Sequence, residues 1–108
     1  METASVFDAL ADPTRRQVLQ LLGGQPMRAS DLARAAGQSR PGMSRHLRVL
    51  LGAGMVQDER DPSDARLRIF RLRAEGLEAA HTWLDQVRAD WGAQLESFRE
   101  QAEGTVRE

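Results

Sequence analysis

The 108-residue sequence contains no cysteine, and it has no long apolar segment. Without cysteine the chain cannot form disulfide bridges, thiolate metal sites or a cysteine nucleophile. No stretch approaches the roughly 18 to 20 consecutive apolar residues that a membrane-spanning helix needs. The N-terminus also lacks a basic stretch followed by an apolar run. We therefore expect no membrane partner and a cytoplasmic location.

The apolar content of 41% is enough for one modest hydrophobic core but not for two. No internal repeat and no low-complexity segment divides the chain. The sequence therefore predicts a single domain that spans residues 1–108.

The formal net charge is only −1, but the charge is unevenly distributed. Residues 28–73 contain ten arginines and five acidic residues, whereas residues 74–108 contain three arginines and eight acidic residues. Neutralisation of phosphates depends on the local density of cations rather than on the total charge. The basic middle segment is therefore typical of a protein with one surface that faces a polyanion, and a solvated surface of mixed charge is the alternative.

Helical spacing of apolar residues predicts three helices in the first third of the chain. The first contains residues 6–11 and the second spans about 13–23, with Asp12 as N-cap and Pro13 at the first helical position between them. A short third helix is predicted for Ser30 to Ala36, and Gly37 follows it in the position that tolerates a positive φ.

A fourth helix is predicted for residues 39–53, with Ser39 as its N-cap and Gly54 as its stop. Met43, Leu47 and Leu50 recur at helical spacing and are expected to face the core. The opposite side then presents hydrogen-bond donors near the start of the helix: Arg40, Ser44, Arg45 and Arg48, with His46 at the edge.

A β-hairpin is predicted for residues 55–72, with the turn formers of residues 61–65 as its connection. The apolar alternation of its second strand slips by one residue, which indicates either two partly covered faces or a bulge. Residues 74–103 then form a long helix with apolar residues at steps of three and four. This apolar surface is more than a small monomer easily covers, so we expect it to contact a partner helix, although packing on its own domain is the alternative.

Two short helices joined by a glycine-containing turn and followed by a hairpin with basic ends form a helix-turn-helix with a wing. Arginine can bind guanine through two hydrogen bonds in the major groove, and serine hydroxyls suit phosphates. The fourth helix is therefore the predicted reading helix. Arg66 and Arg68 are the predicted wing contacts to the minor groove or its phosphates, and ordinary exposed strand residues are the alternative. For His46, a partly buried histidine bonded to the backbone is the alternative to a DNA contact.

Four segments carry a resemblance to a known family: residues 7–16 (FDALADPTRR), 31–33 (DLA), 44–50 (SRHLRVL) and 53–56 (AGMV). Together they resemble the arsenic-repressor-like (ArsR) family of winged-helix regulators, and within it the autorepressors that bind no metal. The fold that this resemblance implies is mainly α with a small β-hairpin and five helices.

The resemblance implies a homodimer that represses transcription by binding a two-fold-related operator in double-stranded DNA. The first and last helices would form the dimer interface, and the side chains expected there are Val6, Phe7, Leu10, Leu84, Val87, Trp91, Leu95 and Phe98. The DNA contacts carried over are Ser39, Arg40, Ser44, Arg45, His46, Arg48, Arg66 and Arg68.

The sequence departs from the metal-sensing members of the family. It has no cysteine pair on the third helix, and His81 is the only histidine on the last helix, so we expect no metal site and no cofactor. Arg28 replaces the usual Thr or Ser cap of the third helix. Arg15 matches a family position, where it either contacts DNA or, as we favour, braces the second helix.

Three other functions compete with this interpretation. An enzyme is not expected, because the sequence offers no nucleophile with a spaced base and no glycine-rich phosphate loop. A protein-interaction module would be expected to lose the arginines of the fourth helix, which this chain retains. A ligand-responsive regulator stays open, because Trp83, Trp91 and Phe98 could border a cavity at the dimer interface.

Overall fold

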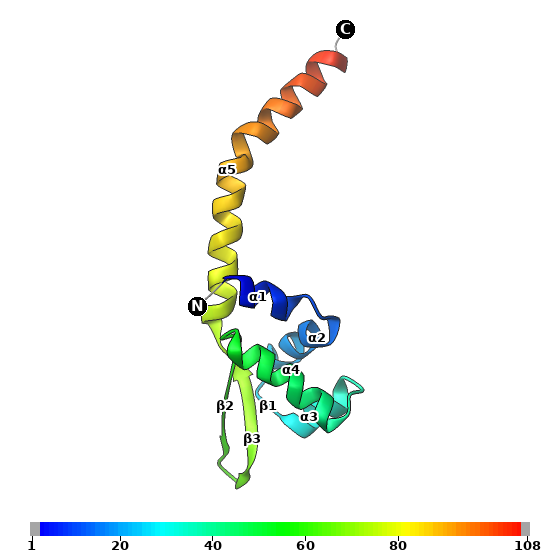
Figure 1. The fold of residues 1–108 in the computed structure, drawn as a ribbon, viewed down its shortest axis with the longest axis vertical. Coiled ribbons are helices and arrows are strands. Elements are labelled where there is room, and N and C mark those ends of the chain that lie inside the picture. Colours follow the sequence, from blue (N-terminus) through cyan, green and yellow to red (C-terminus); the bar gives the residue numbers. More distant parts are fainter. Residues whose placement is uncertain (1–2, 107–108) are drawn as a thin grey trace.

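The computed structural model describes residues 3–106, which form a mainly helical fold with a small antiparallel sheet, as predicted (Figure 1). Within this range the elements are α1 (Thr3–Leu10), α2 (Pro13–Leu22), β1 (Met27–Arg28), α3 (Ala29–Ala35), α4 (Arg40–Gly52), β2 (Val56–Asp61), β3 (Asp64–Leu72) and α5 (Ala74–Val106).

The junction between α1 and α2 is built from side-chain caps. Asp12 accepts hydrogen bonds from the backbone N–H groups of Thr14 (2.7 Å) and Arg15 (3.2 Å), and Pro13 occupies the first helical turn. Although its burial alone would raise the pKa of Asp12, these two bonds and the nearby His46 and Arg15 together lower that pKa. The predicted break between the first two helices is therefore observed.

The helix-turn-helix consists of α3, a short turn and α4. Gly37 adopts a φ of 65° after α3, a conformation that side chains with a Cβ rarely adopt. Ser39 caps α4 by accepting a hydrogen bond from the N–H of Gly42 at 3.1 Å. In contrast, α3 begins without a side-chain cap, because Arg28 stands at its N-cap position.

The wing is a hairpin of β2 and β3, and its connection is shorter than predicted. The strands extend to Asp61 and Asp64, so only Pro62 and Ser63 connect them. The carboxylate of Asp61 accepts the N–H of Ser63 at 2.8 Å, which supports this tight turn. The pairing register shifts between Arg60 and Asp61, whose partners on β3 are Arg68 and Asp64, so residues 65–67 of β3 are out of register. An irregularity is therefore present, but it precedes Ile69 and Phe70, which pair regularly.

A third strand was not predicted. Met27 and Arg28 pair with Phe70 and Ile69, which gives a sheet with the order β1-β3-β2. This strand holds the start of α3 against the wing.

The core lies between the sheet, α1 to α4 and the start of α5. Its fully buried side chains are contributed by five different elements and the loop before β2: Val6, Val18, Leu32, Met43, Leu50, Met55 and Val56. The first turn of α5 joins this core closely, since a Cβ on Gly76 would lie 2.8 Å from Cγ of Met55 and 2.9 Å from the carbonyl oxygen of Ala53.

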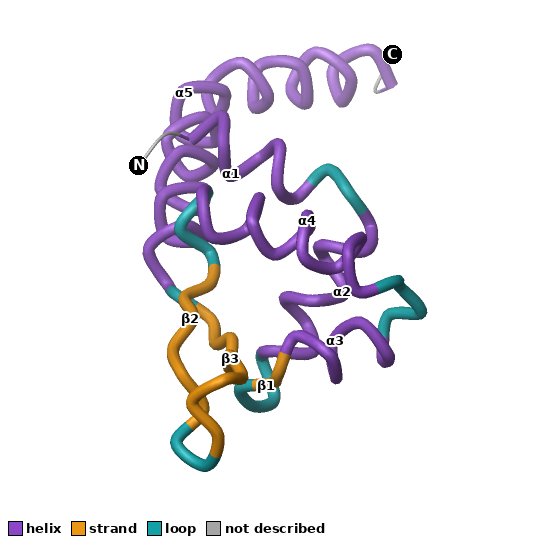
Figure 2. The backbone as a smooth tube through the Cα atoms, turned by 60° about the horizontal axis from the view of Figure 1, so that its bottom comes forward, coloured by secondary structure: helices purple, strands orange, loops and turns teal. Residues whose placement is uncertain are grey.

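Helix α5 extends far beyond the rest of the molecule (Figures 1 and 2). Its first turns pack against α1, where the rings of Phe7 and Trp83 meet edge to face with centroids 5.3 Å apart. The remainder projects away, and the longest dimension of the molecule is 70 Å. We call residues 3–83 the head and residues 84–106 the distal helix.

Candidate nucleic-acid interface

Helix α4 presents one buried face and one exposed face. Met43, Leu47 and Leu50 are at most 2% exposed and anchor the helix to the core. The four predicted donors Arg40, Ser44, Arg45 and Arg48 are all exposed. Because the buried residues recur every three to four positions, the donors follow on the opposite side by helical geometry.

The exposed donors of α4 divide between two sides of the helix. Arg40, Ser44 and Arg48 are spaced four residues apart and line a groove of about 540 Å³ between α4 and the wing. Strand β3 contributes Arg66 and Arg68 to the opposite wall. The remaining lining residues are Arg28, Ala29, Ser30, Leu47, Leu51, Leu67 and Phe70. We call this hollow the α4–β3 groove.

Arg45 and His46 lie outside the lining of this groove. Arg45 is exposed, whereas His46 is half-buried and its Nδ1 lies 3.3 Å from Nη1 of Arg15. A guanidinium can only donate, so this contact requires Nδ1 to accept and leaves the ring proton on Nε2. The sequence predicted His46 as a DNA contact or as a histidine bonded to the backbone, and the structure adds a side-chain partner that neither alternative included.

Arg15 braces the end of α1. Its guanidinium donates to the carbonyl oxygens of Asp8 (2.9 Å) and Ala9 (2.8 Å), and Arg16 donates to that of Leu10 (2.9 Å). The last carbonyls of a helix lack the usual N–H partner four residues on, and although that of Asp8 also accepts from the N–H of Ala11 at 3.2 Å, the two arginines complete the C-terminus of α1. Arg15 therefore braces the second helix, as expected, by tying it to the end of the first.

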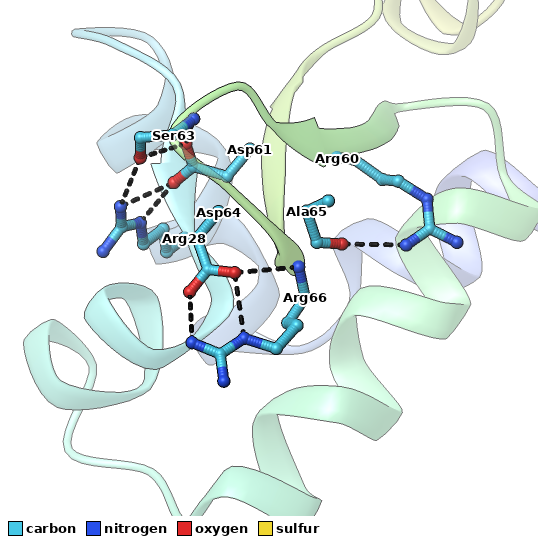
Figure 3. A network of polar contacts seen from close by, with 7 residues as sticks. All are labelled: Arg28, Arg60, Asp61, Ser63, Asp64, Ala65 and Arg66. Atoms are coloured by element: carbon cyan, nitrogen blue, oxygen red, sulfur yellow. Dashed lines mark hydrogen bonds and ion pairs between the residues drawn. The ribbon is translucent and has the colours of Figure 1, made fainter.

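The wing arginines Arg66 and Arg68 are held in ion pairs, and Figure 3 shows that of Arg66. Arg66 binds Asp64 through two parallel hydrogen bonds of 3.0 Å, although its side chain is 89% exposed. Arg68 donates to Asp58 on the neighbouring strand at 2.8 Å. The bonds from Arg66 lower the pKa of Asp64.

The base of the wing is tied to the start of α3. Asp61, which is only 6% exposed, binds Arg28 through Nε at 2.7 Å and Nη2 at 2.6 Å. The hydroxyl and N–H groups of Ser63 donate to the other oxygen of this carboxylate. Ser63 first and then Arg28 lower the pKa of Asp61. The tie to Arg28 was not predicted, because Arg28 and Asp61 lie 33 residues apart in the sequence.

The predicted dimer residues fall into two groups. Four predicted residues of the distal helix are 50% to 67% exposed: Leu84, Trp91, Leu95 and Phe98. Val87, on the same helix, is half-buried. Phe7 and Leu10 belong to the head and are partly buried against its core. Val6 is 0% exposed within the chain itself, so its assignment to the interface is wrong: it belongs to the core and has no surface to offer a second copy.

Residues 3–106 contain no group of three or more His, Cys, Asp or Glu side chains that could hold a metal ion. His81 forms an exposed pair with Asp85 one turn further along α5, at 3.3 Å. None of the helices in this range is both long and apolar enough to cross a membrane.

Comparison with known proteins places this geometry among DNA-binding regulators. A family model described as a helix-turn-helix domain matches residues 10–59. The chain is 45% identical over 80 residues to the transcriptional repressor SdpR of Bacillus subtilis (strain 168), an alignment that covers 74% of this chain and 86% of that protein.

Solved structures agree with this placement. An ArsR-like transcriptional regulator from Rhodococcus sp. RHA1 has a TM-score of 0.77 and 31% identity, over 94% of this chain and 90% of that one. The homodimeric winged helix-turn-helix DNA-binding domain of Mb0332 from Mycobacterium bovis has a TM-score of 0.60 and 29% identity, over 84% of this chain and 81% of that one.

Proposed function

The chain belongs to the ArsR family of winged helix-turn-helix transcriptional regulators, and from this premise we propose that it is a repressor that binds a two-fold-related operator as a homodimer. The family accounts for DNA binding and for the absence of an enzymatic role. Repression, autoregulation, the dimer and the individual contacts belong to the proposal.

The observation that carries the proposal is the basic α4–β3 groove. Five guanidinium groups line it, from Arg28, Arg40, Arg48, Arg66 and Arg68. A groove of this kind, between the helix that enters the major groove and the wing, suits one strand of the sugar-phosphate backbone. We therefore assign phosphate contacts to Arg40, Ser44 and Arg48 on one wall and to Arg66 and Arg68 on the other.

Arg45 is the candidate for reading a base. It is exposed near the start of α4 and lies outside the groove lining, so it is available to the floor of a major groove rather than to the backbone. Ser39 keeps a hydroxyl proton to donate while its oxygen caps α4, and Nε2–H of His46 is the donor that its contact with Arg15 leaves available. Both are assigned as phosphate contacts.

A homodimer would bring two such heads onto one face of DNA. The exposed apolar residues of the distal helix, which we call the seam (Leu84, Val87, Trp91, Leu95 and Phe98), would pack against the same residues of a second copy, with Phe7 and Leu10 nearby. Paired heads must place their reading helices about 34 Å apart, or a multiple of this distance, to enter successive major grooves.

Repression is supported by the relative SdpR, whose name describes a transcriptional repressor. We further propose that the operator lies in the promoter of the protein's own gene and that no metal ion acts as the signal. The expected absence of a metal site stays a prediction, which equilibrium dialysis against Zn²⁺ or Ni²⁺ can test.

The test of this function is a mobility-shift titration on DNA from upstream of the gene, with unrelated duplex as competitor and at two salt concentrations. We expect a specific complex in the range of about 10⁻⁸ to 10⁻¹¹ M that weakens steeply with salt. Transcription in vitro from the same promoter should fall as the complex forms. Equal binding to both DNAs would refute a specific operator at this promoter.

Arg45→Ala tests the assignment of individual contacts. Loss of a base contact should weaken operator binding by about 10- to 100-fold and leave binding to unrelated duplex nearly unchanged. Arg73→Ala is the control, because Arg73 pairs with Glu75 outside the groove and its loss changes the net charge equally. If Arg45→Ala weakens both kinds of binding equally, Arg45 contacts a phosphate instead.

A further inference from the structure

The arginines of the candidate interface differ in their state of pairing. Arg40, Arg45 and Arg48 on α4 form no ion pair with any residue in 3–106, whereas the wing arginines Arg66 and Arg68 are each held by a carboxylate. The head therefore meets DNA with free cations on one wall of the groove and neutralised cations on the other.

The carboxylates that neutralise the wing lie on the groove side of the sheet. Arg68 and Phe70 occupy alternate positions in the regularly paired part of β3, so their side chains share one face, and both line the groove. Asp64 precedes the register shift and is held beside the groove by its ion pair with Arg66, which lines it. Asp58 lies on β2 directly opposite Phe70, which places it on the same face. Figure 3 shows the carboxylate of Asp64 against both nitrogens of the Arg66 fork.

A carboxylate and a phosphate bind the forked donor edge of the Arg66 guanidinium in the same way. Arg66 presents Nε and Nη2 to the two oxygens of Asp64, and these are the donors that would bind two oxygens of a phosphate. One guanidinium edge cannot serve both anions at once. A phosphate that binds this edge of Arg66 must therefore displace Asp64, after which the displaced carboxylate faces the phosphates.

From this geometry we infer that Asp58 and Asp64 compete with the DNA backbone for Arg68 and Arg66 and so limit the affinity of the protein for DNA. The inference rests on the proposed function and adds to it a residue-level control of affinity. The wing contributes less to DNA binding than its arginines would contribute without the two carboxylates. The free arginines of α4 therefore carry most of the electrostatic attraction.

The test is DNA affinity of the full chain with Asp58→Asn and Asp64→Asn. Each removes a charge and keeps an oxygen that can accept, so the bond from the N–H of Arg66 to residue 64 can persist. An exposed ion pair contributes little to stability, so we expect each variant to fold normally and to bind operator DNA roughly two- to fivefold more tightly. The slope of log K against log salt should steepen by about 0.9 for each arginine released.

Glu75→Gln is the matched control. It removes the same charge and frees Arg73 from an exposed pair of 3.0 Å, but neither residue lines the groove. The proposal requires that this variant gain less affinity than either aspartate variant. An equal gain in all three would show a general effect of net charge and would overturn the proposal.

A mutant cycle makes the test independent of net charge. Arg66→Ala should cost less affinity in the wild type than in the Asp64→Asn background, because only in the latter is the guanidinium free for phosphate. Equal costs, or weaker binding by Asp64→Asn, would show that Asp64 positions Arg66 for DNA rather than competing for it. If the wild type binds no DNA, the proposed function fails; if it binds and the aspartate variants gain nothing, only this inference fails.

Discussion

The head and the distal helix differ in the burial of their apolar residues. In the head, Leu32, Met43 and Leu50 are at most 1% exposed, whereas Trp91, Leu95 and Phe98 of the distal helix are 57% to 67% exposed. Met43 and Leu50 on α4 lie at helical spacing in the sequence, and so do Trp91, Leu95 and Phe98 on α5. The difference shows that apolar periodicity identifies a face to be covered, while only the fold tells whether the same chain covers it.

The exposed seam also bears on the stability of the distal helix itself. Most helical stability in proteins comes from tertiary packing rather than from intrinsic propensity. Beyond the contacts of α5 with α1, the described residues supply little such packing. A second copy on the seam would provide it, which ties the order of the distal helix to dimerisation.

The largest expected effect is a loss of dimerisation caused by substitutions in the distal helix. Trp91→Glu with Leu95→Glu places four charges in the seam of a dimer and removes side chains that each contribute about 1.5 to 3 kcal/mol when buried. We expect dimerisation to weaken at least about a thousandfold, while the head stays folded. Sedimentation at micromolar concentration and circular dichroism measure the two effects.

Ala89→Glu with Ala93→Glu is the control for this double variant. Both alanines are exposed and lie about 200° around the helix from Trp91 and Leu95, so the same charges are added away from the seam. If both double variants remain dimeric, the distal helix is not the interface and the comparison between the two regions loses its explanation.

A core substitution should act on the head alone. Leu50→Ala removes a side chain that is 0% exposed, and such cavities cost about 2 to 5 kcal/mol in the free energy of unfolding. Val49→Ala, one residue earlier and 40% exposed, should change stability by less than about 0.5 kcal/mol. Urea denaturation at fixed protein concentration measures both, and similar losses would contradict the core assigned here.

The connection between the two regions gives the next largest effect. Gly76→Ala places a Cβ 2.8 Å from Cγ of Met55 and 2.9 to 3.0 Å from two backbone carbonyl oxygens, so backbone atoms must shift. We expect a loss of about 1 to 3 kcal/mol. Gly52→Ala meets nothing within 4 Å and should stabilise α4 by up to about 1 kcal/mol. Thermal denaturation of the two variants should therefore shift in opposite directions.

Local patterns in the sequence were sufficient for the helices and for the two faces of α4. The spacing of Met43, Leu47 and Leu50 determines which side is buried, and hence which side carries the arginines. The caps Asp12 and Ser39 were also predictable, because a cap acts on residues within the next turn.

Contacts between distant residues were not predictable in this way. Strand β1 has two residues, too few to show an alternation, and it exists because β3 offers it an edge. The pair of Arg28 and Asp61 joins residues 33 positions apart, and the pairing of Arg68 with Asp58 depends on the register of the hairpin. The sequence therefore predicted the wing arginines as contacts but not the carboxylates that hold them.

The smallest expected effect is a pH dependence of the free energy of unfolding that arises in the head. The pKa of Asp61 is lowered in the folded protein by Ser63 and Arg28, so its stabilising contribution is fully present above its unfolded pKa, near 3.9, and is lost as the pH falls through the lower folded value. Asp61→Asn should therefore be less stable than the wild type at pH 7, and the gap should close below about pH 4. Asp90→Asn, on the distal helix, removes one carboxylate outside this network as the control. A gap that stays constant to pH 2 would mean that Asp61 holds the wing through shape and hydrogen bonding alone, since its charge would then make no difference to the head.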